Sequence, residues 1–85
     1  MNRSTNELHD AVRRSLERYF KDMDGERPTS IYDMVLKNIE KPMIETVLGH
    51  AEGNQSLAAQ MLGINRNTLR KKIRELDIKV ARDLK

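Results

Sequence analysis

The stretch Gln55-Ser-Leu-Ala-Ala-Gln-Met-Leu-Gly-Ile-Asn-Arg-Asn-Thr-Leu-Arg-Lys-Lys-Ile-Arg-Glu-Leu76 holds the clearest pattern in this sequence. In its first part, four apolar residues at three- and four-residue steps share one face of a helix: Leu57, Ala58, Met61 and Leu62. Gly63 follows at once, and glycine commonly ends a helix because it adopts a left-handed backbone without steric cost. Ile64 is expected to point back into the core.

The turn leads into a second predicted helix. The side chain of Asn65 can cap this helix by accepting a backbone N–H. An apolar stripe defines its inner face: Leu69, Ile73 and Leu76. A short apolar helix, a glycine turn and a second helix together predict a helix-turn-helix.

The outer face of the second helix is basic. At about 100° per residue, Asn67, Lys71 and Arg74 lie opposite the apolar stripe. Five basic residues and no acidic one stand between Arg66 and Arg74. Arginine and asparagine can pair with base edges in bidentate fashion, whereas lysine and threonine mostly hold phosphates. A solvated basic face is the alternative, but the helix-turn-helix pattern favours duplex DNA as the partner.

Charge is distributed unevenly along the chain. Residues 1–52 contain eight Lys or Arg and ten Asp or Glu, a net charge of −2. Residues 53–85 contain eight basic and three acidic residues, a net charge of +5. Because phosphates repel acidic surfaces, we expect only the C-terminal part to face DNA.

Length and composition limit the remaining possibilities. Eighty-five residues form one domain of marginal size for a self-sufficient core, and the chain has no cysteine for a disulfide. Small, highly charged chains of this kind usually gain burial by forming oligomers. The sequence has no signal peptide, membrane-length apolar span or lipidation motif, so the expected compartment is the cytoplasm.

The first half predicts a helix with an apolar face. Ser4-Thr-Asn-Glu7 is a capping-box pattern that would open this helix. Apolar residues then recur at helical spacing: Leu8, Val12, Leu16, Tyr19, Phe20 and Met23. Asp24-Gly25 is expected to end the helix, and residues 24–29 form a linker.

A further helix over residues 31–51 is unusually rich in apolar residues. Pro42 lies inside it, where proline removes one helical hydrogen bond and crowds the carbonyl of Asn38. The unbroken apolar pattern favours one kinked helix, and the alternative is two helices at 31–40 and 43–51. A single small partner helix could not bury all of these apolar residues, whereas a two-fold interface could. The residues expected in the dimer core are Val12, Leu16, Phe20, Val35, Ile39, Met43 and Val47.

The sequence resembles the Fis family of bacterial nucleoid-associated proteins. The resemblance runs from about Leu8 to Leu76 and is densest over Gly53-Asn-Gln-Ser and Gly63-Ile-Asn-Arg-Asn-Thr-Leu-Arg-Lys-Lys. The C-terminal block also looks like the DNA-binding domain that ends NtrC-type activators. Four stretches favour Fis itself: Tyr19-Phe20, Asp24-Gly25, Ile31-Tyr32 and Lys41-Pro42.

The resemblance implies an all-α, four-helix subunit in an intertwined homodimer. Residues of about 5–52 would form the dimerisation helices, 53–77 the helix-turn-helix and 78–85 a tail, all within one domain of residues 1–85. Fis-like proteins bind and bend degenerate, roughly palindromic DNA sites, with much indirect readout. By position, Asn65 and Arg66 would contact base edges. The residues that would hold or approach phosphates are Asn54, Gln55, Ser56, Thr68, Arg70, Lys71, Lys72 and Arg74.

The sequence departs from the family at both ends. It begins only seven residues before Leu8, so the mobile β-hairpin arm of recombination-enhancing Fis proteins is expected to be absent. The C-terminal tail, Lys79–Lys85, extends beyond the usual end. A frayed, weakly helical tail is expected, and the alternative is an added phosphate contact through Lys79 or Arg82.

Other chemistry has little support in the sequence. His9 and His50 are the only histidines, and neither has a metal-ligand partner three or four residues away. No nucleophile elbow or glycine-rich phosphate loop is present, so we expect no enzyme, metal, cofactor or small-molecule ligand. A helical adaptor that binds an acidic protein is the alternative function. RNA binding lacks stacking aromatic residues near the basic face. The expected partners are duplex DNA and a second copy of the chain, with RNA polymerase as a further candidate.

Overall fold

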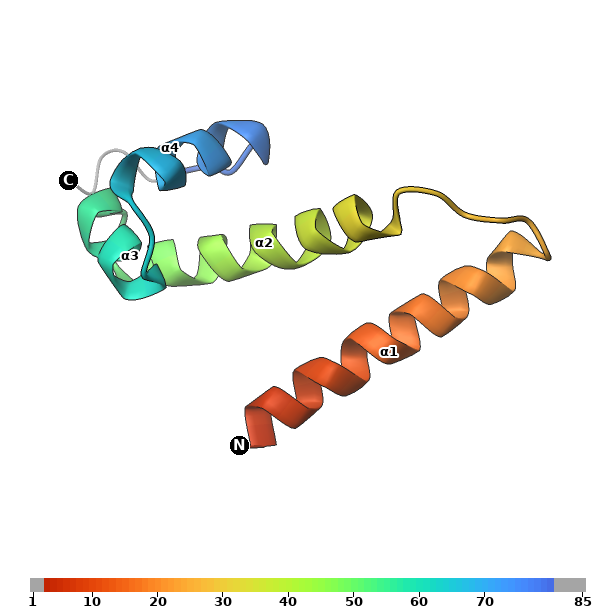
Figure 1. The fold of residues 1–85 in the computed structure, drawn as a ribbon. Helices are drawn as coiled ribbons and strands as arrows, with labels where there is room; N and C mark the ends of the chain where they lie inside the picture. The colour runs from red at the N-terminus through yellow and green to blue at the C-terminus, as the bar shows by residue number, and fades with distance from the viewer. Residues whose placement is uncertain (1–2, 81–85) are drawn as a thin grey trace. The chain divides into compact units, whose positions relative to one another are not determined.

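The computed structural model describes residues 3–80, with the side chains of residues 6–80 (Figure 1). Four helices follow in order, α1 (Arg3–Met23), α2 (Ile31–His50), α3 (Gln55–Leu62) and α4 (Arg66–Glu75). The described residues contain no strand, which confirms the predicted all-α fold. None of these helices combines the length and apolar character needed to cross a membrane. The chain separates into two compact units, residues 1–31 and 32–85.

Helix α1 is amphipathic. It begins at Arg3, one residue before the predicted capping box, and ends at Asp24-Gly25 as predicted. Both residues of this pair have positive φ angles, 54° and 88°, which turn the backbone out of the helix. Leu8 and Phe20 on its apolar face are 52% and 49% exposed. Because the described part of this unit has no second complete helix, it cannot bury that face by itself.

Helix α2 is continuous through Pro42, which confirms the single-helix prediction over the alternative of two helices. Figure 1 shows α2 as one unbroken helical ribbon. Proline has no N–H to donate to the Asn38 carbonyl, but its fixed φ angle is compatible with a helix. The helix therefore carries the apolar residues of its C-terminal half to the core without a break, and the predicted kink at Pro42 stays a prediction.

The core of the second unit joins α2, α3, α4 and the segment after α4. Its fully buried members are Ile44, Leu48, Ala51, Ala58, Ala59, Leu69 and Ile78. Five partly buried residues pack against them: Val47, Leu62, Ile73, Leu76 and Val80. The predicted inner face of α4 is therefore confirmed.

Only part of the apolar face predicted for α3 is buried, and the prediction that Ile64 points into the core is wrong. Leu57 and Met61 on α3 are 41% and 53% exposed, because the close packing of α3 uses the alanine side of the helix instead. Ile64 is 37% exposed. Its N–H donates to the Ala59 carbonyl at 3.0 Å, and the next residue already caps α4, so the short turn keeps its side chain at the surface.

The segment after α4 folds back onto the core. Asp77 has a left-handed φ of 54°, and the Ile78 N–H donates to the Ile73 carbonyl at 3.0 Å, which closes the helix end. Ile78 is only 6% exposed. Of the extension predicted to be frayed, Lys79–Lys85, the structure describes two residues, and Val80 packs against the core. Lys79 is exposed, and Arg82 lies outside the described residues.

Replacing Ile78 by alanine should destabilise the protein by about 2–5 kcal/mol, because it removes buried methyl and methylene groups from the core. Urea unfolding at fixed protein concentration measures this loss. The neighbouring Lys79→Ala variant is the control, and it should change stability by less than about 0.5 kcal/mol. Equal effects of the two substitutions would contradict the burial of the tail.

Candidate nucleic-acid interface

Helix α3 begins with a side-chain cap. Asn54 has an extended backbone (φ −77°, ψ 104°), and its Oδ1 accepts the N–H of Leu57 at 3.0 Å. The preceding Glu52 and Gly53 have φ angles of 55° and 81°, which reverse the chain after α2. This turn sets the start of α3 close to the end of α2, where both contribute to the core.

The turn between α3 and α4 is closed by backbone hydrogen bonds. Gly63 has a left-handed φ of 78°, as predicted. Its N–H donates to the Ala59 carbonyl at 2.9 Å and to the Gln60 carbonyl at 3.2 Å. With the bond from Ile64 to Ala59, these satisfy carbonyls at the end of α3.

Asn65 caps α4, as predicted. Its backbone is extended (φ −69°, ψ 144°), and its Oδ1 accepts the N–H of Asn67 at 2.7 Å. Bidentate pairing of an asparagine with adenine uses both its oxygen and its amino group. Because the oxygen of Asn65 is held by the cap, the Nδ2 amino group is the part of this side chain best placed to donate to a base.

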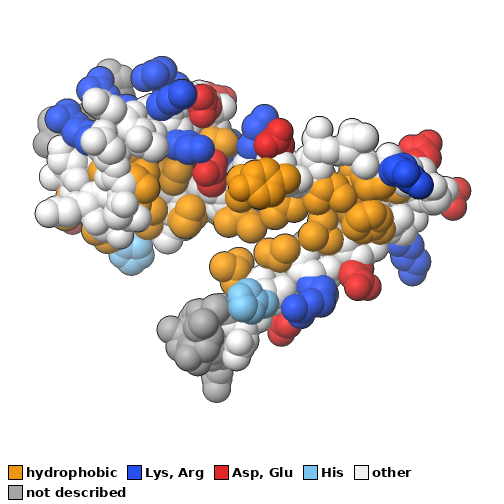
Figure 2. All heavy atoms as spheres, viewed as in Figure 1, with side chains coloured by type: hydrophobic (Ala, Val, Ile, Leu, Met, Phe, Trp, Pro, Cys, Tyr) orange, Lys and Arg blue, Asp and Glu red, His pale blue; other side chains and the backbone are white. Residues whose placement is uncertain are grey.

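The outward face of α4 carries exposed polar and basic side chains. They are Arg66, Asn67, Thr68, Arg70, Lys71 and Arg74. Figure 2 shows Lys and Arg side chains gathered over this helix. No acidic residue lies between Glu52 and Glu75, and Glu75 is the last residue of α4. The helix therefore presents positive charge along nearly its whole length.

Lys72 differs from the other predicted phosphate contacts. Of the five basic residues between Arg66 and Arg74, all of them described, Lys72 alone is half-buried. Its Nζ forms an ion pair with Glu40 Oε2 on α2 at 3.1 Å. No local sequence pattern predicts this pair, because its members lie 32 residues apart in the chain.

Three of the predicted phosphate contacts lie at the N-terminus of α3. Asn54 and Ser56 are exposed, and Gln55 is half-buried. The first turn of α3 has no acidic residue. A helix N-terminus with unpaired N–H groups and no carboxylate suits a phosphate.

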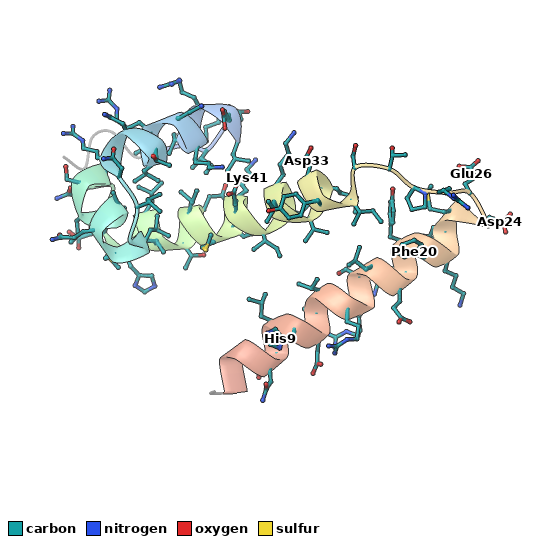
Figure 3. All side chains as sticks on the ribbon, viewed as in Figure 1. His9, Phe20, Asp24, Glu26, Asp33 and Lys41 are labelled. Atoms are coloured by element: carbon teal, nitrogen blue, oxygen red, sulfur yellow. The ribbon has the colours of Figure 1, made fainter. Side chains whose placement is uncertain are left out.

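The predicted dimer residues divide into two groups. Val12, Leu16 and Phe20 lie on α1, where Phe20 is 49% exposed (Figure 3). The other four are on α2: Val35, Ile39, Met43 and Val47. Val47 already packs against the core of its own unit, whereas Met43 is 45% exposed. Tyr32, absent from the predicted set, is the most exposed of the large apolar residues described, at 76%.

Fold and site define a helix-turn-helix protein. A family model described as "Bacterial regulatory protein, Fis family" matches residues 35–76. A protein of Ralstonia nicotianae, named as a Fis-like DNA-binding protein, is 56% identical over 72 residues, which is 85% of this chain and 94% of the relative. The chain belongs to the Fis family.

Two further relatives extend this finding. The DNA-binding protein Fis of Glaesserella parasuis is 47% identical over 68 residues, 80% of this chain and 69% of the relative. The DNA-binding transcriptional regulator NtrC of Azospirillum brasilense is 53% identical over 79 residues, 92% of this chain but 16% of the relative. The likeness to NtrC therefore extends well beyond the C-terminal block, and the stretches before that block do not by themselves separate the two kinds of protein.

Replacing Asn65 by alanine should lower the stability of the protein by about 0.5–2 kcal/mol, because the first turn of α4 loses its cap. Asn65→Ser keeps an oxygen acceptor and should recover most of this loss. Thermal unfolding compares the two variants, with Asn67→Ala as a control on the same turn. If serine is as harmful as alanine, the cap does not stabilise α4.

Proposed function

We propose that this protein binds and bends duplex DNA as a homodimer and acts as a nucleoid-associated regulator of transcription. The observation that carries the proposal is the exposed basic face of α4, presented by a capped helix-turn-helix. Membership of a family of bacterial regulators and the names of its DNA-binding relatives support it. On this proposal the protein lies in the cytoplasm at the nucleoid, and has neither enzymatic activity nor a cofactor.

The first residues of α4 are the best candidates for base contacts. In a helix-turn-helix, the N-terminal end of the second helix meets base edges in the major groove. Arg66 is exposed there, and its guanidinium can pair with guanine. Asn65 adds a single donor from its amino group. The proposed phosphate contacts are Asn54, Gln55, Ser56, Thr68, Arg70, Lys71 and Arg74.

The small number of side chains proposed to read bases, Asn65 and Arg66, favours indirect readout. If Asn65 and Arg66 make the main base contacts, most positions of a binding site are never touched. Selectivity at those positions then depends on how easily the DNA bends or its minor groove narrows. The proposed sites are therefore degenerate, and two-fold symmetry of the protein would make them palindromic.

Exposed apolar side chains support the homodimer. Leu8 and Phe20 on α1, and Leu36 and Met43 on α2, are each at least 38% exposed. Large apolar groups gain stability when removed from water, and a second copy of the chain supplies matching surfaces. Two copies also provide two α4 helices for successive major grooves, about 34–36 Å apart. RNA polymerase remains a further candidate partner.

The proposal is tested by gel shift on circularly permuted fragments with A/T-rich or G/C-rich centres. A bent complex with two chains per duplex, and different affinities for the two centres, is the expected result. Competition by unlabelled duplex separates DNA binding from binding to an acidic protein. Failure to shift any fragment at low salt would overturn the proposal.

Replacing Arg66 by alanine should cost roughly 1–3 kcal/mol of discrimination between a specific and a shuffled duplex, because a base contact is lost. Arg70→Ala is the matched control, and it should weaken binding to both duplexes alike. Titration of each variant with both duplexes provides the measurement. If Arg66→Ala also weakens both equally, Arg66 does not read bases.

Replacing Phe20 by glutamate should shift the protein from dimer to monomer, because it places a charge on the apolar face of α1. Sedimentation equilibrium over a range of concentrations measures the change. Lys21→Glu, on the exposed neighbour, is the control and should stay dimeric. A stable monomer of the unmodified chain would disprove the dimer.

A further inference from the structure

Glu40 and Lys72 connect the long helix α2 to α4. The Lys72 Nζ lies 3.1 Å from Glu40 Oε2 and 3.4 Å from Oε1, so the ammonium faces both carboxylate oxygens. Among residues 6–80, the other ion pair is Asp10–Arg13, within α1. The Glu40–Lys72 pair is thus the one ion pair of the described residues that joins two helices.

This pair is partly shielded from solvent. The side chains of Lys72 and Glu40 are 35% and 24% exposed, against 67% and 61% for Arg13 and Asp10. Water and salt screen a partly buried pair less than an exposed one. Removal of one partner would leave a partly desolvated charge without its counter-ion. The pair is therefore a more persistent contact than the one on α1.

Lys72 also lies on the inner side of α4. At about 100° per residue, it is about 60° from the buried Leu69 around the helix, whereas Lys71 is about 160° away. Lys71 is exposed, and Lys72 is half-buried. The two adjacent lysines therefore present their charges in different directions, one outward and one toward α2.

We propose that Glu40 holds Lys72 away from DNA phosphates, so that Lys72 positions α4 against α2 and does not bind DNA directly. This inference rests on the proposed DNA binding and deepens it. It departs from the resemblance, which places Lys72 among the phosphate contacts. Glu40, a residue of a helix outside the helix-turn-helix, thereby limits the positive charge that α4 offers to DNA.

The salt dependence of binding to duplex DNA reports the number of phosphate contacts. Each contact contributes about 0.9 to the slope of log affinity against log salt concentration. In a dimer, every substitution occurs twice. Lys71→Gln should therefore make the slope shallower by about 1.8, whereas Lys72→Gln should leave it nearly unchanged.

Glu40→Gln tests the release of Lys72. Without the carboxylate, Lys72 can turn toward a phosphate, and the slope should become steeper by up to about 1.8 per dimer. The double variant Glu40→Gln/Lys72→Gln should return to the slope of the unmodified protein. Glu45→Gln, which removes an exposed carboxylate from the same helix, is the matched control and should not change the slope.

Thermal unfolding without DNA tests the contact itself. Lys72→Gln and Glu40→Gln should each lower the midpoint by a few degrees, and the double variant should lower it by less than the sum of the two. Additive shifts would show that the pair does not couple α2 to α4. That result would overturn the positioning role of Lys72.

The slopes separate failure of this inference from failure of the proposed function. If Lys71→Gln and Lys72→Gln reduce the slope equally, both lysines bind phosphates and only this inference fails. If the double variant stays as steep as Glu40→Gln, the charge of Glu40 acts on DNA directly and the inference also fails. If the unmodified protein binds no duplex, the proposed function fails as well.

Discussion

The direction in which α4 presents its charges depends on how closely α3 and α4 approach each other. Ala58 and Ala59 on α3 are 0% and 3% exposed, and Leu69 on α4 is 0% exposed in the same buried cluster. Alanine side chains end at Cβ, so a leucine from the crossing helix can be fully buried against this side of α3. Burial of such a side chain is worth roughly 1.5–3 kcal/mol. A larger residue at either alanine would move α4 and, with it, every basic side chain on its outer face.

The two short helices are stable only as parts of this core. Helices α3 and α4 have 8 and 10 residues, and isolated helices shorter than about 12–15 residues are marginal in water. Side-chain caps at Asn54 and Asn65 and the backbone closure at Gly63 satisfy their ends within a very short turn. Asn65 has two roles in this arrangement. Its side chain caps the N-terminus of α4, and it lies at the end of the helix that is proposed to read bases.

Helix α2 links the proposed dimer to the proposed DNA-binding surface. Its C-terminal half supplies Ile44 and Leu48 to the core beneath α3 and α4, and its Glu40 pairs with Lys72. Its Met43 is nearly half exposed. Apolar packing and one ion pair therefore hold α4 against α2. The same helix α2 is expected to contact a second chain. In the proposed dimer, a change at the interface between the two copies would alter the spacing of the two α4 helices.

Local rules were enough to predict the helical architecture and much of the candidate site. Hydrogen bonds within a single turn decide the glycine end of α3 and the asparagine cap of α4. Helical periodicity decides the continuity of α2 through Pro42 and the inner face of α4. All four features therefore follow from neighbouring residues. Only the tertiary structure decided which side of α3 is buried, leaving Leu57 and Met61 outside, and it alone brought Ile78 into the core. It also paired Lys72 with Glu40 across 32 residues. These features depend on contacts between distant segments, for which a periodic pattern within one helix carries no information.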